Sequence, residues 1–506
     1  MDKKNFKKTV FSSIIWKFGE RLSAQLVSFA VSVILARMLT PNDYGMVALV
    51  MVFIYIADVF VSSGLGMSLI QKKDADHLDF SSVFYINILI SVIIYSILFL
   101  IAPFVARFYE NDMLCHILRV IGLRIPIAAI NSVQQAYVAK RMEFKKFFYS
   151  TLSGTLLSGV IGIYMAYKGF GTWALVAQYL SNTCVDTLVL SITVKWAPKP
   201  EFSWNRAKGL ISYGWKMLVS GLISAGCDQI RSLIIGKKYS SADLAYYNHG
   251  NRYPQLIVIN LNDSISSVLY PALANYQDDK AKVKHMTRTA IQVSSYIMWP
   301  AMCGLAVVAK PLVTILLTEK WLPCVEFLQI FCFFYAFYPH ATANLQAIKA
   351  MGRSDIFLKL QIVKYSINLM MLLITMQYGP LFIAAGMLIS CVVSVFVNAY
   401  PNIKILDYRL KEQLRDLFST FFMACIMAGA IFPLSFIPVN PKIVLVLQVI
   451  IGVLVYTVTS ILFQPQGYIQ IAEIFFSTEW GKAKMEKAKS LKRMYKRINE
   501  ARGRIS

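Results

Sequence analysis

Residues 81–107 read SSVFYINILISVIIYSILFLIAPFVAR, and this stretch decides the fold because it has no charged side chain before Arg107. At about 1.5 Å of rise per residue, a helix of this length reaches beyond the roughly 30 Å of hydrocarbon in a bilayer. The whole chain has the same character, since 57% of its 506 residues are hydrophobic, 15% are charged and the mean hydropathy is +0.55. Soluble domains have about 25% charged residues. We therefore predict a protein that lies mostly within a membrane.

Similar apolar runs recur along the chain, separated by short polar gaps. Because roughly 20 apolar residues cross a bilayer as a helix, they predict an all-α polytopic membrane protein with about fourteen transmembrane helices. The predicted spans are residues 10–38, 44–69, 81–107, 113–138, 149–167, 171–195, 209–235, 244–274, 289–309, 325–350, 357–377, 381–400, 417–436 and 443–463. No gap is long enough for a soluble domain, which argues against an enzyme that polymerises or ligates sugars outside the membrane.

The basic residues predict the orientation. Alternate gaps, counted from the N-terminus, hold about 35 Lys and Arg, whereas the other gaps hold about 8. Basic loops stay on the cytoplasmic side, so we expect both termini in the cytoplasm of a bacterial inner membrane. The net charge of +24 is explained by these short clusters, and no nucleic-acid partner is expected. Lys17, Glu20 and Arg21 interrupt the first run, which favours a retained helix over a cleaved signal peptide.

Two segments about 200 residues apart resemble each other. Each contains Trp-Lys (16–17 and 215–216), then SVILAR (32–37) or SLIIGK (232–237), and then Asp43 or Asp243. The same order at an offset of six spans predicts two parallel six-helix lobes, with the substrate site between them. The predicted domains are an N-lobe at 1–200, a C-lobe at 201–404, two more helices at 405–464 and a basic cytoplasmic tail at 465–506, lying near anionic headgroups.

Charged side chains occur within the predicted spans, where each costs at least about 2.5–3.5 kcal/mol unless it has a partner or a water-filled cavity. Cations predominate, and Arg suits phosphate because its planar fork donates two hydrogen bonds at once. The residues predicted to line a cationic cavity for an anionic substrate are Lys17, Arg21, Arg124, Lys216, Arg231 and Arg252. The candidates for coupling to H⁺ or Na⁺ are Glu20, Asp58 and Asp228. Alternatively, such charges form ion pairs that hold helices together, for example Asp228 with Arg231.

The sequence contains no motif for catalysis or for a cofactor. It has no Walker-type phosphate loop, no nucleophile elbow and no metal-binding His/Glu pair. Its eight cysteines include no Cys-x-x-Cys pair. We therefore expect neither an enzyme nor a bound metal or cofactor.

Five motifs carry a family resemblance. They are ILARMLTPNDYG (34–45), SLIQKKD (68–74), APFVARFY (102–109), QA (135–136) with FK (144–145), and GFGTWALV (169–176). Together they resemble the Wzx-type polysaccharide flippases of the multidrug/oligosaccharidyl-lipid/polysaccharide superfamily, most closely over the first 200 residues. The motif at 34–45 lies at a span end, where we expect it to shape a turn rather than to contact substrate.

The resemblance implies a fold like that of the multidrug transporters of this superfamily, working by alternating access. It also implies a cargo, a polyprenyl-diphosphate-linked oligosaccharide repeat unit of an exopolysaccharide, capsule or O-antigen. The cargo would pass from the cytoplasmic to the outer leaflet, with membrane lipids and the polysaccharide polymerase machinery as partners. The motifs do not discriminate among sugars.

Three other functions stay open. A drug or cation antiporter of the same superfamily would favour an acidic, aromatic pocket. A peptidoglycan-precursor flippase would share the cationic lumen but fits the motifs less well. A membrane-embedded polysaccharide polymerase would need a long external loop. The excess of cations within the spans favours the oligosaccharide flippase.

Overall fold

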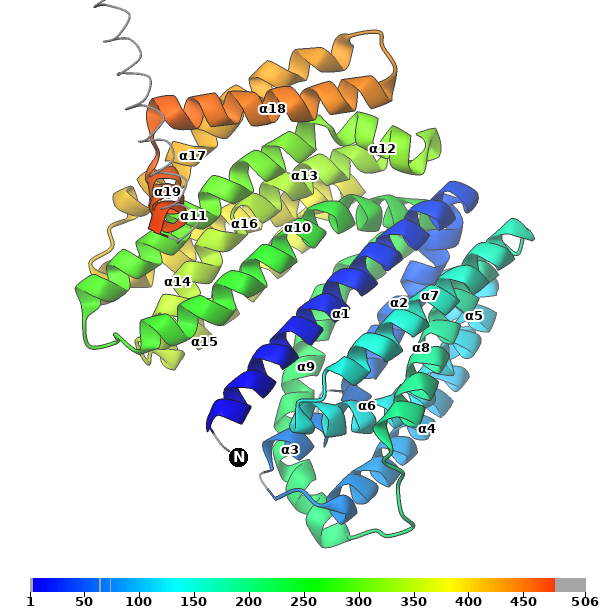
Figure 1. Ribbon diagram of the computed structural model, residues 1–506. Helices are drawn as coiled ribbons and strands as arrows, with labels where there is room; N and C mark the ends of the chain where they lie inside the picture. The colour runs from blue at the N-terminus through cyan, green and yellow to red at the C-terminus, as the bar shows by residue number, and fades with distance from the viewer. Residues whose placement is uncertain (1–2, 63–64, 73, 478–506) are drawn as a thin grey trace, which may run out of the picture. The chain divides into compact units, whose positions relative to one another are not determined.

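The computed structural model describes residues 3–62, 65–72 and 74–477, and within these ranges the chain forms helices and turns but no strand (Figure 1). The prediction of an all-α polytopic membrane protein is therefore confirmed. The α-helices of the first half are α1 (Lys3–Met38), α2 (Pro41–Ser62), α3 (Leu65–Gln71), α4 (His77–Phe108), α5 (Met113–Gly122), α6 (Arg124–Arg141), α7 (Lys145–Tyr167), α8 (Thr172–Val194) and α9 (Trp204–Lys238). Those of the second half are α10 (Ser241–Ala274), α11 (Lys280–Val307), α12 (Ala309–Leu317), α13 (Cys324–Ala336), α14 (Tyr338–Ala350), α15 (Ser354–Thr375), α16 (Pro380–Leu406), α17 (Leu410–Ile431), α18 (Pro441–Phe463) and α19 (Gln466–Ser477).

Contacts divide the chain into two compact units. The first holds the residues up to Asn248 together with Leu316–Pro323 and Tyr378–Pro380, and the second holds the remainder. The predicted boundary between lobes near residue 200 stays a prediction.

Only the first part of the predicted basic tail, which forms α19, is described; its cluster from Lys482 onward lies outside the described residues.

Thirteen helices in the described part of the chain are long and apolar enough to cross a membrane. Fourteen were expected, and the difference lies at 325–350, where two shorter helices, α13 and α14, meet at Phe337. Pro339 accounts for the interruption, because it lies in the first turn of α14 and has no N–H to donate back to a carbonyl of α13. The predicted fourth span is interrupted in the same way, between α5 and α6, where Pro126 lies in the first turn of α6.

The two similar segments form the same capped turn. Before α2, Asp43 Oδ2 accepts hydrogen bonds from Thr40 N at 2.9 Å and Thr40 Oγ1 at 2.6 Å. Before α10, Asp243 Oδ2 accepts them from Ser240 N at 3.1 Å and Ser240 Oγ at 2.7 Å. Each arrangement is a capping box, which satisfies N–H groups that the first helical turn leaves without partners. The repeat seen in the sequence is therefore also a repeat of local structure.

The motif at 34–45 is held by the segment 316–323 of the same unit. Arg37 Nε donates to the Leu316 carbonyl at 2.8 Å, and Trp321 Nε1 donates to the Ala36 carbonyl at 2.8 Å. Lys320 Nζ donates to the Arg37 carbonyl at 2.7 Å. The bonds from Trp321 and Lys320 use carbonyls at the end of α1, which its last turn leaves free. The motif thus shapes and anchors a turn, as expected.

Two glycines permit close helix packing in this unit. A Cβ on Gly45 of α2 would lie 1.7 Å from the Ser241 carbonyl oxygen, and one on Gly236 of α9 would lie 2.1 Å from Leu49 Cδ2. Neither position has room for a side chain. Small residues at helix crossings allow backbones to approach closely in membrane proteins.

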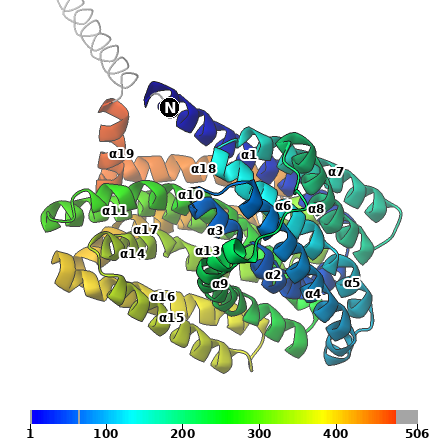
Figure 2. The same cartoon turned by 90° about the horizontal axis from the view of Figure 1, so that it is seen from below.

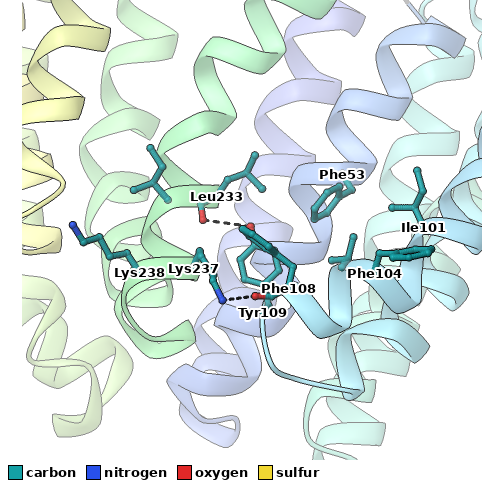
Figure 3. Close-up of a pocket in the computed structure, with 10 residues that line it drawn as sticks. Phe53, Ile101, Phe104, Phe108, Tyr109, Leu233, Lys237 and Lys238 are labelled. Carbon is teal, nitrogen blue, oxygen red and sulfur yellow. Dashed lines mark hydrogen bonds between the residues drawn. The ribbon is translucent and has the colours of Figure 1, made fainter.

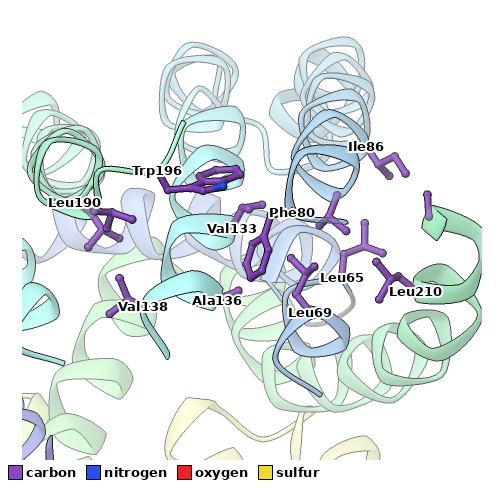
Figure 4. Packing of buried hydrophobic residues seen from close by; sticks show 13 residues of the cluster. Leu65, Leu69, Phe80, Ile86, Val133, Ala136, Val138, Leu190, Trp196 and Leu210 are labelled. Atoms are coloured by element: carbon purple, nitrogen blue, oxygen red, sulfur yellow. The ribbon is translucent and has the colours of Figure 1, made fainter. Parts of the chain in front are cut away.

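An apolar cluster anchors the linker between α8 and α9 (Figure 4). Trp196 of this linker packs against α4 and α6, with its ring 6.0 Å from that of Phe80 and 6.1 Å from that of Tyr137. The backbone N–H groups of Lys199 and Ser203 donate to the hydroxyls of Ser81 and Ser82. Arg206 donates to Asp76, the N-cap of α4, and this hydrogen bond lowers the pKa of the Asp76 carboxyl to about 2. The linker is therefore fixed to the start of α4.

Neighbouring helices of each unit can be followed in both views. In the first unit α7 packs against α8 and α1, and in the second α17 packs against α11 and α18 (Figures 1 and 2). Asp416 of α17, which is 4% exposed, accepts from Arg288 Nε at 2.5 Å and Gln292 Nε2 at 2.7 Å, both on α11. Tyr408 also donates to this carboxylate, at 2.8 Å. This network joins α11 to α17.

The two capped turns should differ in strength. The second oxygen of Asp43, Oδ1, accepts from Thr172 Oγ1 at 2.7 Å and so joins α2 to α8. We expect Asp43→Ala to cost about 2 kcal/mol of stability and Asp243→Ala about 1 kcal/mol, since only the first loses this additional bond. Unfolding of the purified variants in a denaturing-detergent titration measures both. Asn42→Ala, an exposed change in the same turn, is the control; equal losses for the two aspartates would contradict the prediction.

Candidate functional site

The charged residues of α1 face two different environments. Glu20 Oε1 accepts a hydrogen bond from Thr151 Oγ1 of α7 at 3.2 Å, whereas the Arg21 side chain is exposed. Lys17 lies on α1, but its side chain is not among the described ones. Glu20 is therefore part of the contact between α1 and α7, and Arg21 remains accessible on the helix surface.

Asp58 and Arg124, predicted separately as a coupling residue and a cavity residue, are partners. Arg124 Nη2 lies 3.4 Å from Asp58 Oδ2, and Arg124 Nε donates to Thr183 Oγ1 at 2.9 Å. The side chains of Asp58 and Arg124 are 22% and 23% exposed. Asp58 Oδ1 is buried and has no hydrogen-bond partner among the described residues. One guanidinium thus joins α2, α6 and α8 while one carboxylate oxygen stays available.

Asp186 is a functional candidate that the sequence reasoning missed. It is the only charged residue of α8, and Asn131 Nδ2 of α6 donates to its Oδ2 at 2.5 Å. Glu20 lies near enough for the two carboxylates to repel each other. The signal was available, because a single acid within an otherwise uncharged span must have a polar partner or water.

Further hydrogen bonds extend this polar seam along α6, α7 and α8. Gln134 Nε2 donates to Ser191 Oγ at 2.8 Å, and Asn182 Nδ2 donates to Ser158 Oγ at 3.3 Å. A Cβ on Gly154 of α7 would lie 3.1 Å from the Asn182 carbonyl oxygen. The seam therefore combines small residues with amide and hydroxyl groups, a pattern that holds membrane helices together.

The remaining predicted residues lie on α9 and α10. Asp228 and Arg231 are one turn apart on α9 and attract each other electrostatically. Lys216 is also on α9, but its side chain is not described. Arg252 lies on α10 within the second unit, where its charge acts on the buried His249. Of the predicted cavity arginines, Arg21, Arg124 and Arg231 therefore belong to the first unit and Arg252 to the second.

An apolar groove of about 630 Å³ lies between α2, α4 and α9 (Figure 3). Phe53, Phe104 and Leu233 are among its lining residues, and Lys237 and Lys238 are at its edge. Lys237 Nζ donates to the Phe108 carbonyl and lies 3.0 Å from Glu110 Oε1. The groove thus offers mainly hydrocarbon contacts, and one of its two lysines already has an acidic partner.

The described residues contain no group of three or more His, Cys, Asp or Glu that could hold a metal ion. All eight cysteines are free thiols. The chemistry that the described side chains offer is therefore hydrogen bonding and ion pairing, in which guanidinium groups bind phosphate or carboxylate and paired carboxylates bind a proton or a small cation.

A family model described as "Polysaccharide biosynthesis protein" matches residues 34–326 of the chain. The match begins at the motif 34–45 and continues through α9 and α10 into α13. It therefore includes both copies of the capped turn.

Relatives and a solved structure agree with this match. The chain is 25% identical to the succinoglycan biosynthesis transport protein ExoT of Rhizobium meliloti. The match covers 62% of this chain and 64% of that protein. It is 22% identical to the lipopolysaccharide biosynthesis protein WzxC of Escherichia coli, over 77% of this chain and 80% of that one. The structure of the lipid II flippase MurJ in an inward closed conformation matches with a TM-score of 0.71 at 16% identity, over 89% of this chain and 99% of that one, which shows the fold.

The pair of Asp58 and Arg124 should show energetic coupling. We expect Arg124→Gln to destabilise the protein because it leaves Asp58 without its cation, and Asp58→Asn to do so to a lesser degree. The double variant should recover about 1–2 kcal/mol relative to the sum of the single changes, as contacting residues do. A double-mutant cycle from denaturing-detergent unfolding measures this coupling. Additive losses would mean that the two side chains do not interact in the folded protein.

Proposed function

Because the chain belongs to the polysaccharide biosynthesis protein family, we propose that it is a flippase for polyprenyl-diphosphate-linked oligosaccharides. The cargo would be a repeat unit of an exopolysaccharide, a capsule or an O-antigen, transferred from the cytoplasmic to the outer leaflet. The observation that carries the proposal is the family match at 34–326, which includes both copies of the capped turn. The names of the relatives, which include a succinoglycan transport protein, support the same cargo class.

The proposed path for the headgroup is a cationic cavity between an N-lobe at 1–200 and a C-lobe at 201–404. Lys17, Arg21, Arg124, Lys216, Arg231 and Arg252 would bind the diphosphate and any acidic sugar. Arginine is the appropriate residue, because its planar fork matches two phosphate oxygens and it stays protonated at every physiological pH. The exposed side chain of Arg21 on α1 supports its accessibility.

Asp58 would couple the binding of cargo to the binding of a cation, because it shares Arg124 with the cargo phosphate. Its carboxylate and a phosphate compete for the same Arg124 guanidinium, since one arginine at 3.4 Å from Asp58 cannot bind both fully. A proton or Na⁺ on Asp58 would release Arg124 for the phosphate, and release of the cargo would restore the pair. Glu20 and Asp228 are the other proposed coupling residues, and each already has a polar or charged neighbour, Thr151 and Arg231 respectively.

Both termini would be in the cytoplasm of a bacterial inner membrane, as the excess of Lys and Arg in alternate loops indicates. The two helices at 405–464 would add to those of the lobes. The chain would act as a transporter without catalytic activity and would deliver its cargo to the polysaccharide polymerase machinery.

Deletion of the gene in its host tests this function. We expect lipid-linked oligosaccharide to accumulate in the cytoplasmic leaflet and the wild-type gene to restore its transfer. Arg21→Ala and Arg231→Ala should each slow the transfer about tenfold or more, because a lost hydrogen bond to a charged group costs about 1.5–3 kcal/mol. Leaflet-specific labelling of the intermediate in membrane vesicles measures both the distribution and the rate.

Lys442→Ala is the matched control, because it removes an exposed cation from the start of α18, outside both predicted lobes. It should transfer cargo at the wild-type rate. A deletion strain with a normal leaflet distribution but altered drug resistance would reject the flippase and favour a drug or cation antiporter. Equal loss in all three variants would reject the cationic cavity while leaving the flippase function in place.

A further inference from the structure

A second, basic pocket lies wholly within the second unit. It has a volume of about 440 Å³ and is formed by the start of α11, the turn between α14 and α15, and the end of α16. Its charged lining residues are Lys280, Arg353 and Lys404, and no acidic residue lines it. None of these three was among the residues predicted to bind cargo. The pocket therefore concentrates positive charge where α11 and α15 begin and α14 and α16 end.

The local charges leave this pocket with a net positive potential. Arg353 is engaged with Asp355, whose two oxygens accept from its Nε at 3.0 Å and its Nη2 at 2.9 Å. Lys404 Nζ lies 5.8 Å from the centre of the Tyr400 ring, an interaction that leaves its charge intact. Asp279, next to Lys280, caps α11 by accepting from the Lys282 N–H at 3.0 Å. Lys280 and Lys404 are therefore the two lining cations that remain to bind an anion.

Two long helices direct their positive ends toward the same place. The pocket includes Lys280, the first residue of α11, and Arg353, the N-cap of α15. A helix N-terminus carries about half a positive charge and presents free N–H groups, which favours anions. The C-terminal ends of α14 and α16 lie at the same pocket and offset these dipoles, so the net positive charge comes from the lysines.

The rest of the lining is apolar. Met351, Ile356, Pro401 and Ile405 form the wall beside the cations, and Tyr400 is 61% exposed at the rim. Tyrosines in this position are typical of the boundary between headgroups and hydrocarbon. A ligand that fits must therefore combine an anionic group with an apolar body at a helix end. A free, fully hydrated phosphate would make no favourable contact with the apolar part of the lining.

We propose that this pocket binds the headgroup of an anionic glycerophospholipid, with the phosphate at Lys280 and Lys404 and the acyl chains along the apolar wall. Basic pockets between transmembrane helices on the cytoplasmic side are recognised sites for such lipids. The bound lipid connects α11, α15 and α16 and so stabilises the second unit. The site is separate from the residues proposed to bind the diphosphate of the cargo, and its occupancy does not depend on transport.

Competition between two lipids tests the site. The full-length protein, purified in detergent, is offered equal amounts of dioleoylphosphatidylglycerol and dioleoylphosphatidylcholine, and the retained lipids are counted by native mass spectrometry. We expect the wild type to prefer phosphatidylglycerol. Lys280→Gln combined with Lys404→Gln should weaken that preference roughly 10- to 30-fold, because each surface cation contributes about tenfold or less to the binding of an anionic lipid.

Lys359→Gln combined with Lys411→Gln is the matched control. It removes two exposed lysines from α15 and α17 of the same unit, neither of which lines the pocket. The preference should survive in this control, and in the wild type it should fall as salt is raised. Equal loss in both double variants, or a salt-independent preference, would overturn the proposal.

A third arm replaces phosphatidylglycerol with a polyprenyl diphosphate. If only that lipid is lost on changing Lys280 and Lys404, the pocket belongs to the cargo path and the phospholipid site is rejected. Because the measurement needs no transport, failure of the proposed flippase function would leave this result unaffected.

Discussion

In hydrocarbon, a polar group that lacks a partner costs several kcal/mol, and only the chain itself can supply that partner. The backbone meets this constraint by forming helices in the predicted spans. The side chains meet it in pairs: Asp58 with Arg124, Asp186 with Asn131 and Asp416 with Arg288. Apolar side chains pack nearly as well against lipid as against each other, so apolar contacts alone discriminate weakly between possible neighbouring helices. The polar pairs therefore determine which helices lie side by side.

The most recognisable motif of the sequence, at 34–45, is structural. Its Arg37 donates to a backbone carbonyl, and Asp43 is used in a capping box and in a bond to Thr172. A charged residue that is committed to backbone groups is a poor ligand for a substrate. The motif identifies the family because the turn needs these residues, whereas the cargo must be recognised elsewhere on the helices.

The fold was largely predictable, because hydrophobic run length and loop charge are direct consequences of the bilayer. Sequence alone did not give the interruption at Phe337, although Pro339 was visible, because continuous hydropathy concealed it. The candidate site was less predictable. Asp58 and Arg124 were both identified, but their pairing depends on how α2 and α6 pack, which periodicity does not encode. Asp186 was missed because a single acid among 23 residues of α8 hardly lowers the hydropathy of the span.

The geometry of the pair formed by Asp58 and Arg124 suits a role in coupling better than a role in fold stability alone. A fully buried, bidentate pair would resist exchange, since breaking it costs about 3–5 kcal/mol. Here the nearest atoms are 3.4 Å apart, both side chains are over a fifth exposed, and Thr183 already shares the guanidinium. Under the proposed function, an incoming phosphate would offer Arg124 another anionic acceptor, and a cation on Asp58 would remove its competitor. A switch between two states needs a free-energy difference of only a few kcal/mol between them, so a pair that can be broken without a larger cost suits such a switch.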